Sequence, residues 1–227
     1  MTDDAEPCAE ASGSCPRRGR QAEAELNDQR VLEAARDVFA CEGADAPVAA
    51  VARRAGVGMG SLYRRYGSKE ELLQRLCELS MEQSVAAAEE ALASDEDPWT
   101  AFTEFVRRCV RNRCGAFAPV AGRIPVSDAM DRTYRRSERL LSQLVARTQA
   151  DGSLRPDVNT VDISRLIELF SRSFGSGCGG RTDDLVARRL LALALAGLRV
   201  TDGDPLPGPM PSLADYEGRW TFAGDRS

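Results

Sequence analysis

Apolar residues recur along most of the chain at spacings of three and four, a pattern typical of helices with one buried face. The clearest case begins at residue 48, where one apolar face comprises Val48, Val51, Ala52 and Ala55. Gly56-Val57-Gly58 interrupts this pattern, and a second helix beginning at about Met59 carries Leu62, Tyr63 and Tyr66. No stretch shows the strict alternation of a β-strand, so the sequence predicts an all-α fold.

The two short helices around residues 56–58 have the spacing of a helix-turn-helix. Ala52 is small enough for the helices to approach, Gly56 can adopt the left-handed conformation of a sharp turn, and Leu62 anchors the second helix. An ordinary helical hairpin in a core is the alternative. The basic side chains on and after the second helix favour a nucleic-acid interface, and they are Arg64, Arg65 and Lys69.

The remaining pattern predicts a first helix from about Asn27 or Asp28 to Gly43 and further helices in a second bundle. A capping box at Ser68 and Glu71 begins a long helix to about Ala93. Further helices are predicted over residues 98–113, 127–150, 161–174 and 183–200. A short helix within residues 116–125 and a turn or two within 213–220 complete a total of about nine to ten helices.

The chain has 227 residues, a net charge of −5, no histidine and one lysine, Lys69. This length accommodates one small and one larger domain, and an acidic body is compatible with a local basic surface. Without histidine the commonest general base and metal ligand are missing. We also find no phosphate loop and no metal-ligand spacing, so we expect neither an enzyme nor a cofactor or metal site.

The seven cysteines include no CxxC pair, and the acidic start of the chain has no apolar targeting segment. We therefore expect a cytoplasmic protein with buried or free thiols, although Cys109 and Cys114 leave a redox or soft-metal sensor open. Residues 1–22 read as a disordered arm. Its arginines at positions 17, 18 and 20 either reach a minor groove or belong to a solubilising tail.

The run from Gln29 to Leu73 resembles the DNA-binding domain of the TetR family of bacterial regulators. The resemblance rests on VLEAARDVFACEG and VAAVARRAGVGMGSLYRRYGSKEELL, which together cover the first third of the chain. This sequence departs from the family at Arg65, where histidine is usual, and at Tyr66, where phenylalanine is usual. The resemblance implies a helix-turn-helix domain over residues 23–70 and a ligand-binding and dimerisation domain over residues 71–227.

The resemblance and the local chemistry together suggest residues that contact DNA. Base edges in the major groove would be met at the start of the second motif helix by Met59, Gly60, Ser61 and Tyr63. Phosphates would be held by Tyr63, Arg64, Arg65 and Lys69. The alternatives are partial core packing for Tyr63 and a solvated face for the two arginines.

The resemblance also implies a homodimer in which the helices 161–174 and 184–200 pair with their copies. The apolar residues of these helices serve core and interface, and the sequence does not divide them: Ile163, Leu166, Ile167, Phe170, Leu190, Leu191, Leu195 and Leu198. A small-molecule effector is implied in the second domain. Candidate lining residues are Trp99, Phe102, Phe105, Val106, Met130, Tyr134 and Phe174. An aromatic stripe at this spacing also fits plain core packing.

These features predict a sequence-specific, nucleoid-associated DNA-binding regulator. The favoured hypothesis is a repressor that binds an inverted-repeat operator as a dimer and is released by its ligand. The alternative is a ligand-independent architectural or regulatory DNA-binding protein.

Overall fold

The computed structural model describes residues 16–118, 124–173, 181–201 and 203–214, and within these ranges it is all-helical. The eight helices are α1 (Pro16–Glu42), α2 (Val48–Ala55), α3 (Met59–Tyr66), α4 (Lys69–Ala93), α5 (Pro98–Arg111), α6 (Asp128–Ala150), α7 (Thr160–Ser173) and α8 (Arg181–Gly197). The predicted fold class is therefore confirmed. An isolated antiparallel bridge between Leu154 and Arg199 is the only β pairing in these ranges.

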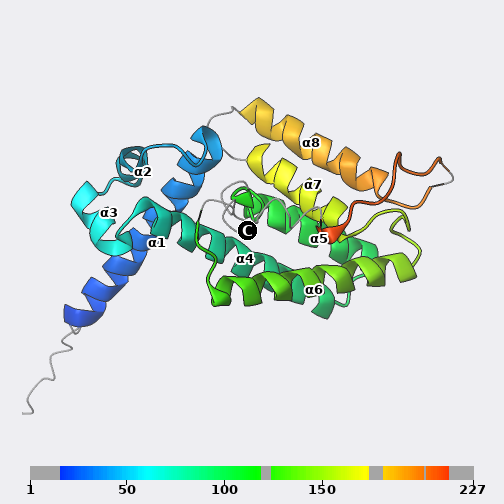
Figure 1. Ribbon diagram of the computed structural model, residues 1–227, viewed down its shortest axis with the longest axis horizontal. Coiled ribbons are helices and arrows are strands. Elements are labelled where there is room, and N and C mark those ends of the chain that lie inside the picture. Colours follow the sequence, from blue (N-terminus) through cyan, green and yellow to red (C-terminus); the bar gives the residue numbers. More distant parts are fainter. Residues whose placement is uncertain (1–15, 119–123, 174–180, 202, 215–227) are drawn as a thin grey trace, which may run out of the picture.

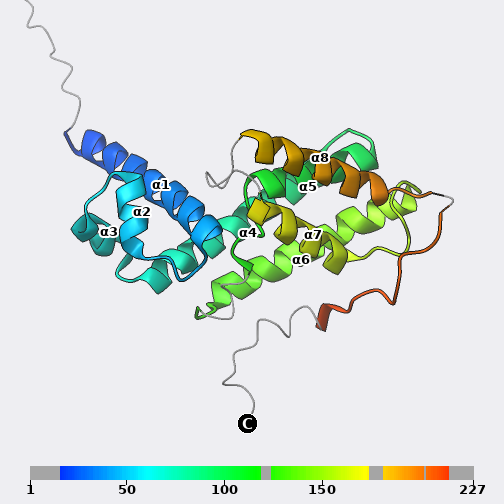
Figure 2. The same cartoon turned by 90° about the horizontal axis from the view of Figure 1, so that it is seen from above.

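Helices α1 to α3 form a small domain at one end of the molecule, and α4 runs from it into the larger bundle (Figure 1). In the larger bundle α5 and α6 pack on α4, α7 packs on α5 and α6, and α8 packs on α7 (Figure 2). The Ser68 hydroxyl begins α4 by accepting a hydrogen bond from the Glu71 amide at 3.1 Å. The predicted cap of the long helix is thus confirmed, and the helix connects the two domains as expected.

The predicted start of the first helix is wrong. Helix α1 begins at Pro16, inside the segment 1–22 that we expected to be disordered, while residues 1–15 lie outside the described residues. Asp28 does not cap it, because its carboxylate bonds to side chains of α3. The first turn of α7 is capped by Asn159, whose side-chain oxygen accepts from the amides of Val161 at 2.9 Å and Asp162 at 3.2 Å.

The helix count is lower than predicted within the described ranges. Residues 112–117 form turns, and 119–123, half of the segment 116–125 in which a further short helix was expected, lie outside the described part. The same holds for 215–220 at the end of the chain. None of the described helices is both long and apolar enough to cross a membrane.

The apolar interior consists of two clusters. One fills the larger bundle and centres on Phe102, Val106, Leu144 and Ile163. The other fills the small domain between α1 and α4, and it extends to Phe117, Ile124 and Met130 of the larger domain. The boundary between the domains is therefore packed with apolar side chains rather than bridged by a solvated linker.

The structure divides the apolar residues of α7 and α8 into core and surface. Ile163, Ile167, Phe170, Leu191, Leu195 and Leu198 are buried. Leu193 is 67% exposed and Leu190 is 50% exposed, and Val186 is exposed four residues before Leu190. Because these three recur at helical spacing, α8 presents an apolar stripe on the outside of the chain.

Candidate functional site

The helix-turn-helix has the geometry that its sequence predicted. Gly56 ends α2 with φ +69°, a left-handed conformation that strains residues with a Cβ atom, and the Val57 amide donates to the Ala52 carbonyl at 3.1 Å. Leu62 is buried between the helices, and so is the ring of Tyr66. These contacts fix the side of α3 that turns away from the domain.

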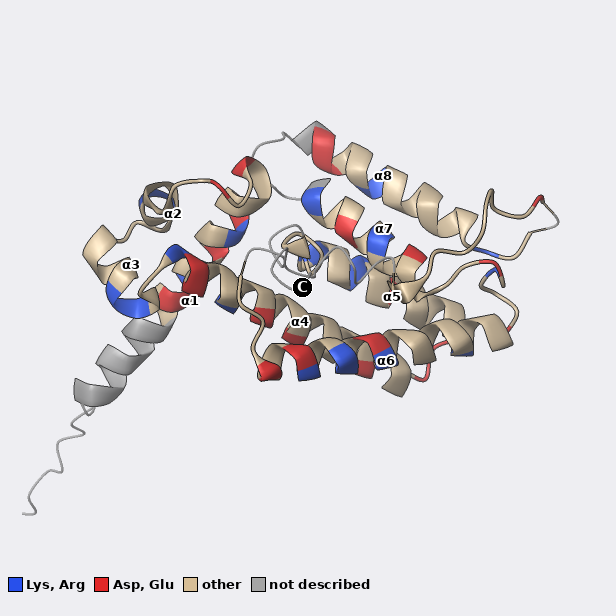
Figure 3. Ribbon diagram, in the orientation of Figure 1, with Lys and Arg blue, Asp and Glu red and all other residues tan. Residues whose placement is uncertain are grey.

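The exposed side of α3 carries the residues predicted to meet base edges. Tyr63 is 44% exposed and Met59 is 38% exposed, and Gly60 and Ser61 lie on the surface beside them. Tyr63 is therefore not core. Arg64 is exposed next to this surface, and basic segments appear on α2 and α3 in Figure 3. A helix presented in this way fits the major groove.

An ion pair joins α3 to α1. Asp28 accepts hydrogen bonds from Arg65 at 2.9 and 3.2 Å and from the hydroxyl of Tyr66. Both donors are the residues at which this sequence departs from the family pattern. Two of the guanidinium donors of Arg65 are thus used within the chain, although its side chain remains 63% exposed and therefore accessible from outside.

At the Asp28 carboxylate, hydrogen bonds and charge lower the pKa by more than burial raises it. Burial alone would raise the pKa of Asp28, but the hydrogen bonds from Arg65 and Tyr66 and the positive charge of Arg65 hold this pKa below its usual value. The pKa of Tyr66 is raised by its burial and by the bond to Asp28, so its hydroxyl remains a donor at neutral pH. The three side chains therefore fix the position of α3 against α1.

Lys69 lies at the first turn of α4, beside the small domain. Its ammonium nitrogen is 5.7 Å from the centroid of the Phe39 ring, which is buried on α1. This cation–π contact holds the ammonium group beside the ring, and the residue stays partly exposed at the start of a long helix. The arrangement suits a phosphate, since helix N-termini attract anions.

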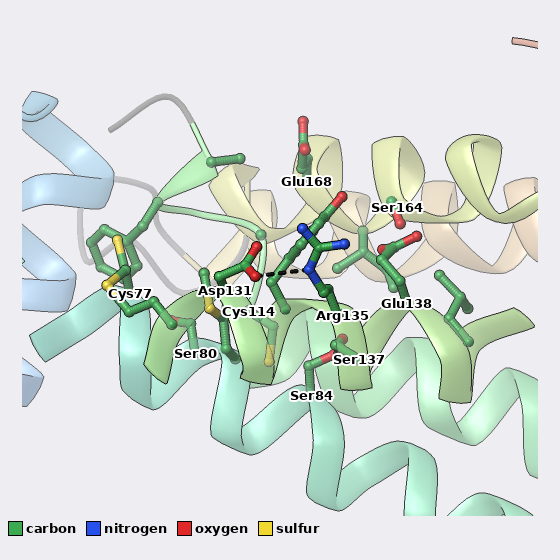
Figure 4. A pocket seen from close by; sticks show the side chains of 18 of the residues that line it. Cys77, Ser80, Ser84, Cys114, Asp131, Arg135, Ser137, Glu138, Ser164 and Glu168 are labelled. Carbon is green, nitrogen blue, oxygen red and sulfur yellow. Dashed lines mark hydrogen bonds and ion pairs between the residues drawn. The ribbon is translucent and has the colours of Figure 1, made fainter. Parts of the chain in front are cut away.

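A cavity of 370 Å³ lies in the larger domain between α4, α6 and α7 (Figure 4). Residues 114, 115, 117 and 118 after α5 and residues at the start of α6 also contribute to the lining. The apolar lining comprises Met81, Phe105, Phe117, Ala118, Ile124, Val126, Met130, Leu141 and Ile167. Hydroxyls, thiols and charged groups complete the wall: Cys77, Ser80, Ser84, Cys114, Asp131, Tyr134, Arg135, Ser137, Glu138, Ser164 and Glu168.

The structure brings three of the predicted lining residues together at this cavity: Phe105, Met130 and Tyr134. Trp99, Phe102 and Val106 do not line this cavity. Phe102 and Val106 are completely buried in the core, and Trp99 packs on Phe102 at 6.0 Å between ring centroids. Phe174 lies outside the described residues. Four of the seven predicted lining residues lie on α5, but α5 contributes only Phe105, and most of the wall comes from α4, α6 and α7.

Two buried cysteines, Cys77 and Cys109, are protonated thiols. Burial raises the pKa of Cys77 to about 12, and the pKa of Cys109 is raised by its hydrogen bond with Cys114 and by its own burial. These thiols therefore act as small apolar groups rather than as thiolate nucleophiles. Within the described residues no three potential metal-ligating side chains come together.

Asp37 of α1 joins the cavity wall to the small domain. One carboxylate oxygen accepts from Arg113 at 2.8 Å, and the other accepts from Arg54 of α2 at 3.0 Å. Arg113 directly precedes Cys114 and Gly115, which line the cavity, and its side chain is only 10% exposed. The same aspartate thus contacts both the helix-turn-helix and the segment after α5 that lines the cavity.

Gly115 fixes the other side of this segment. A Cβ atom at Gly115 would lie 2.5 Å from the Cα atom of Glu168, so only glycine allows the segment to approach α7 this closely. Its amide donates to the buried hydroxyl of Ser171 at 3.2 Å. Displacement of this segment would therefore also displace α7 and, through Arg113, Asp37.

Sequence reasoning missed the serines of α4 and the bonds of Asp28, Asp37 and Arg113. Ser80 and Ser84 gave a usable signal, because they lie one turn apart close to the apolar stripe of a long helix. The ion pairs gave none, since Asp37 and Arg113 are 76 residues apart.

The sequence profile of the tetR family of bacterial regulatory proteins matches residues 31–76. A second profile, for the C-terminal domain of SbtR-like transcriptional regulators, matches residues 97–200. The two matches coincide with the small domain and with most of the larger one. No curated protein matches the chain.

Solved structures have the same fold. A TetR regulatory protein from Mycobacterium vanbaalenii is 30% identical, with a TM-score of 0.53 over 80% of this chain and 99% of that one. The TetR regulator SCO0520 from Streptomyces coelicolor is 26% identical, with a TM-score of 0.52 over 76% and 98% of the two chains. The ketosteroid transcriptional regulator KstR2 of Mycobacterium tuberculosis is 22% identical, with a TM-score of 0.54 over 84% and 99%, and supports the fold alone.

The bonds of Asp28 generate a first prediction. Asp28→Asn should lower the free energy of unfolding by about 1 kcal/mol at pH 7, because the ion pair is lost and the buried Tyr66 hydroxyl keeps a weaker acceptor. Since the folded-state pKa of Asp28 is depressed, this stabilisation is full above the unfolded value of about 4 and is lost as the pH falls further.

Urea unfolding at pH 7 and at pH 3.5 measures this difference. The gap between wild type and Asp28→Asn should narrow at the lower pH, whereas Glu33→Gln, an exposed carboxylate on the same helix, should show little effect at either pH. An equal loss at both pH values would contradict the electrostatic account.

Proposed function

The chain belongs to the tetR family of bacterial regulatory proteins and is a DNA-binding transcriptional regulator, and from this premise we propose that it is a ligand-released repressor. In this proposal a homodimer binds an inverted-repeat operator at the nucleoid, and a small molecule in the 370 Å³ cavity lowers its affinity for DNA. A ligand-independent regulator remains the second candidate.

The exposed face of α3 supports the sorting of its residues into two roles. Met59, Gly60 and Ser61 lie at the N-terminal end of α3, where a recognition helix meets base edges. Tyr63, Arg64 and Arg65 follow, and Lys69 lies at the start of α4. We assign this second group to phosphates, because cationic and hydroxyl donors bind the backbone without reading sequence.

One observation carries the proposal that a ligand controls DNA binding. Phe117, Ile124 and Met130 line the cavity and also belong to the apolar cluster of the small domain. A molecule that entered the cavity would displace side chains that pack on the DNA-binding domain. Because packed interiors repack in discrete arrangements, such a displacement favours one position of α1 and α4 over another.

The ion pairs of Asp37 add a polar route to the same displacement. Arg113 follows any shift of the cavity segment, and Asp37 holds Arg54 of the helix-turn-helix. Affinity for the operator would then fall by the ratio of ligand affinities for the two arrangements.

The exposed stripe of α8 supports dimerisation. Val186, Leu190 and Leu193 lie outside the core on one of the two helices that the family resemblance assigns to the dimer interface. A patch of large apolar side chains on a surface helix favours association, because water is removed from it. Two copies of the small domain would then bind the two half-sites of the operator.

The DNA contacts yield the second prediction. Arg64→Ala and Lys69→Ala should weaken binding to all sequences alike and lower the slope of log affinity against log salt by about one unit for each phosphate that is no longer bound. Ser61→Ala should change the preferred sequence and leave the slope unchanged. Selection from random DNA and salt titration by fluorescence anisotropy measure both; a changed sequence preference for Lys69→Ala would reverse our assignment.

The dimer yields the third prediction. Leu193→Glu should weaken self-association at least tenfold, because it would bury a charge in an apolar interface. Light scattering at micromolar concentration should give twice the 24.6 kDa chain mass for wild type and a lower mass for this variant. Leu206→Glu, exposed in the C-terminal segment, is the matched control and should remain dimeric. A monomeric wild type would exclude the proposed assembly.

The cavity yields the fourth prediction. Phe105→Trp should fill the cavity, preserve operator binding and abolish release by any compound that releases wild type. Phe102→Trp is the matched control, since Phe102 lies in filled core and overpacking there typically costs about 1–3 kcal/mol. Urea unfolding and anisotropy with the selected operator measure both effects. If a compound library yields no release of wild type, the ligand-independent regulator becomes the better proposal.

A further inference from the structure

The deep part of the cavity offers apolar contact almost throughout. Phe105, Phe117, Ile124 and Met130 are buried in its wall, and the neutral thiol of Cys77 lies beside them. A molecule held here loses its hydration without gaining a compensating charge. A charged group placed at this depth would therefore be strongly disfavoured.

The charged groups of the lining do not supply a site for an anion. Arg135 is the only basic residue among the lining residues that the structure describes, and its Nε atom donates to Asp131 at 2.7 Å. Figure 4 shows this ion pair on α6, with Glu138 on the same helix and Glu168 on α7. An anionic ligand would lie near three carboxylates and would have to compete with Asp131 for the guanidinium.

One polar group in the wall lacks a partner. Ser80 of α4 is 3% exposed, and its hydroxyl oxygen is buried without a hydrogen bond. The neighbouring hydroxyls differ, because Ser84 and Ser137 bond to each other at 3.3 Å across α4 and α6. A buried hydroxyl gains a hydrogen bond when a ligand group reaches it, so Ser80 marks the position of a polar atom of the ligand.

These three observations define a class of ligand. Building on the proposed function, in which the cavity receives an effector, we infer that this effector is uncharged and mostly apolar and carries a hydroxyl or carbonyl group that bonds to Ser80. The cavity volume of 370 Å³ is near the lower end of small-molecule sites, which span about 300–1,000 Å³. A compact, uncharged ring system fits this description, whereas compounds with a carboxylate or phosphate group do not.

Four naphthalene probes of one skeleton test the inference on the full-length protein without DNA. They are 2-naphthalenemethanol, 2-methylnaphthalene, 2-naphthoate and 2-naphthylmethylammonium, and naphthalene fluorescence reports their dissociation constants. The neutral alcohol should bind at least tenfold more tightly than either charged probe. Ser80→Ala should weaken the alcohol about fivefold, the effect of one hydrogen bond, and leave 2-methylnaphthalene unchanged.

Ser142→Ala is the matched control, because Ser142 is exposed on α6 and outside the cavity lining, and it should leave both affinities unchanged. Circular dichroism verifies that each variant folds. The inference is overturned if 2-naphthoate binds as tightly as the alcohol, if Ser80→Ala affects both neutral probes equally or neither, or if no probe binds.

The experiment distinguishes failure of the proposed function from failure of the inferred ligand class. If the alcohol binds through Ser80 and no neutral compound changes operator affinity, the ligand class stands and ligand-controlled release does not. If a charged compound releases the operator through the cavity, release stands and the ligand class is wrong.

Discussion

The structure depends on one apolar contact region in which the two domains share side chains. Phe117, Ile124 and Met130 belong to the larger domain by sequence, yet they pack with α1 and α4 of the DNA-binding domain and also line the cavity. A linker of solvated residues would let the domains move independently. Shared packing prevents this, because a close-packed interior cannot change on one side without a response on the other.

Ion pairs and one close backbone contact connect this region to the helix-turn-helix and to α7. Asp37 holds Arg54 and Arg113 at once, and Gly115 brings the segment after Arg113 against α7. Such ion pairs contribute little stability where water reaches them, but they fix register. The segment 113–117 therefore connects three parts that are remote in sequence: the helix-turn-helix, the cavity and α7.

The DNA-binding domain uses a similar device within itself. Arg65 and Tyr66, the two departures from the family pattern, both bond to Asp28. In this chain a position that we assign to phosphate contacts and a core position form one ion-paired cluster that orients α3. Because a guanidinium carries five N–H donors, a side chain on the recognition helix can stabilise the helix position internally and still offer donors to DNA.

The sequence by itself determined the all-α class, the helix-turn-helix turn at Gly56, the cap at Ser68, and the buried and exposed faces of α3, because these follow from local conformation and helical periodicity. It placed the start of α1 too late and the cavity wall on α5, since both depend on what packs nearby. Only the tertiary structure separated Phe105 from Phe102, paired Asp37 with Arg113, and left Ser80 without a partner. Periodicity states which face of a helix is buried, but the neighbouring helices decide whether that face meets other side chains or an empty volume.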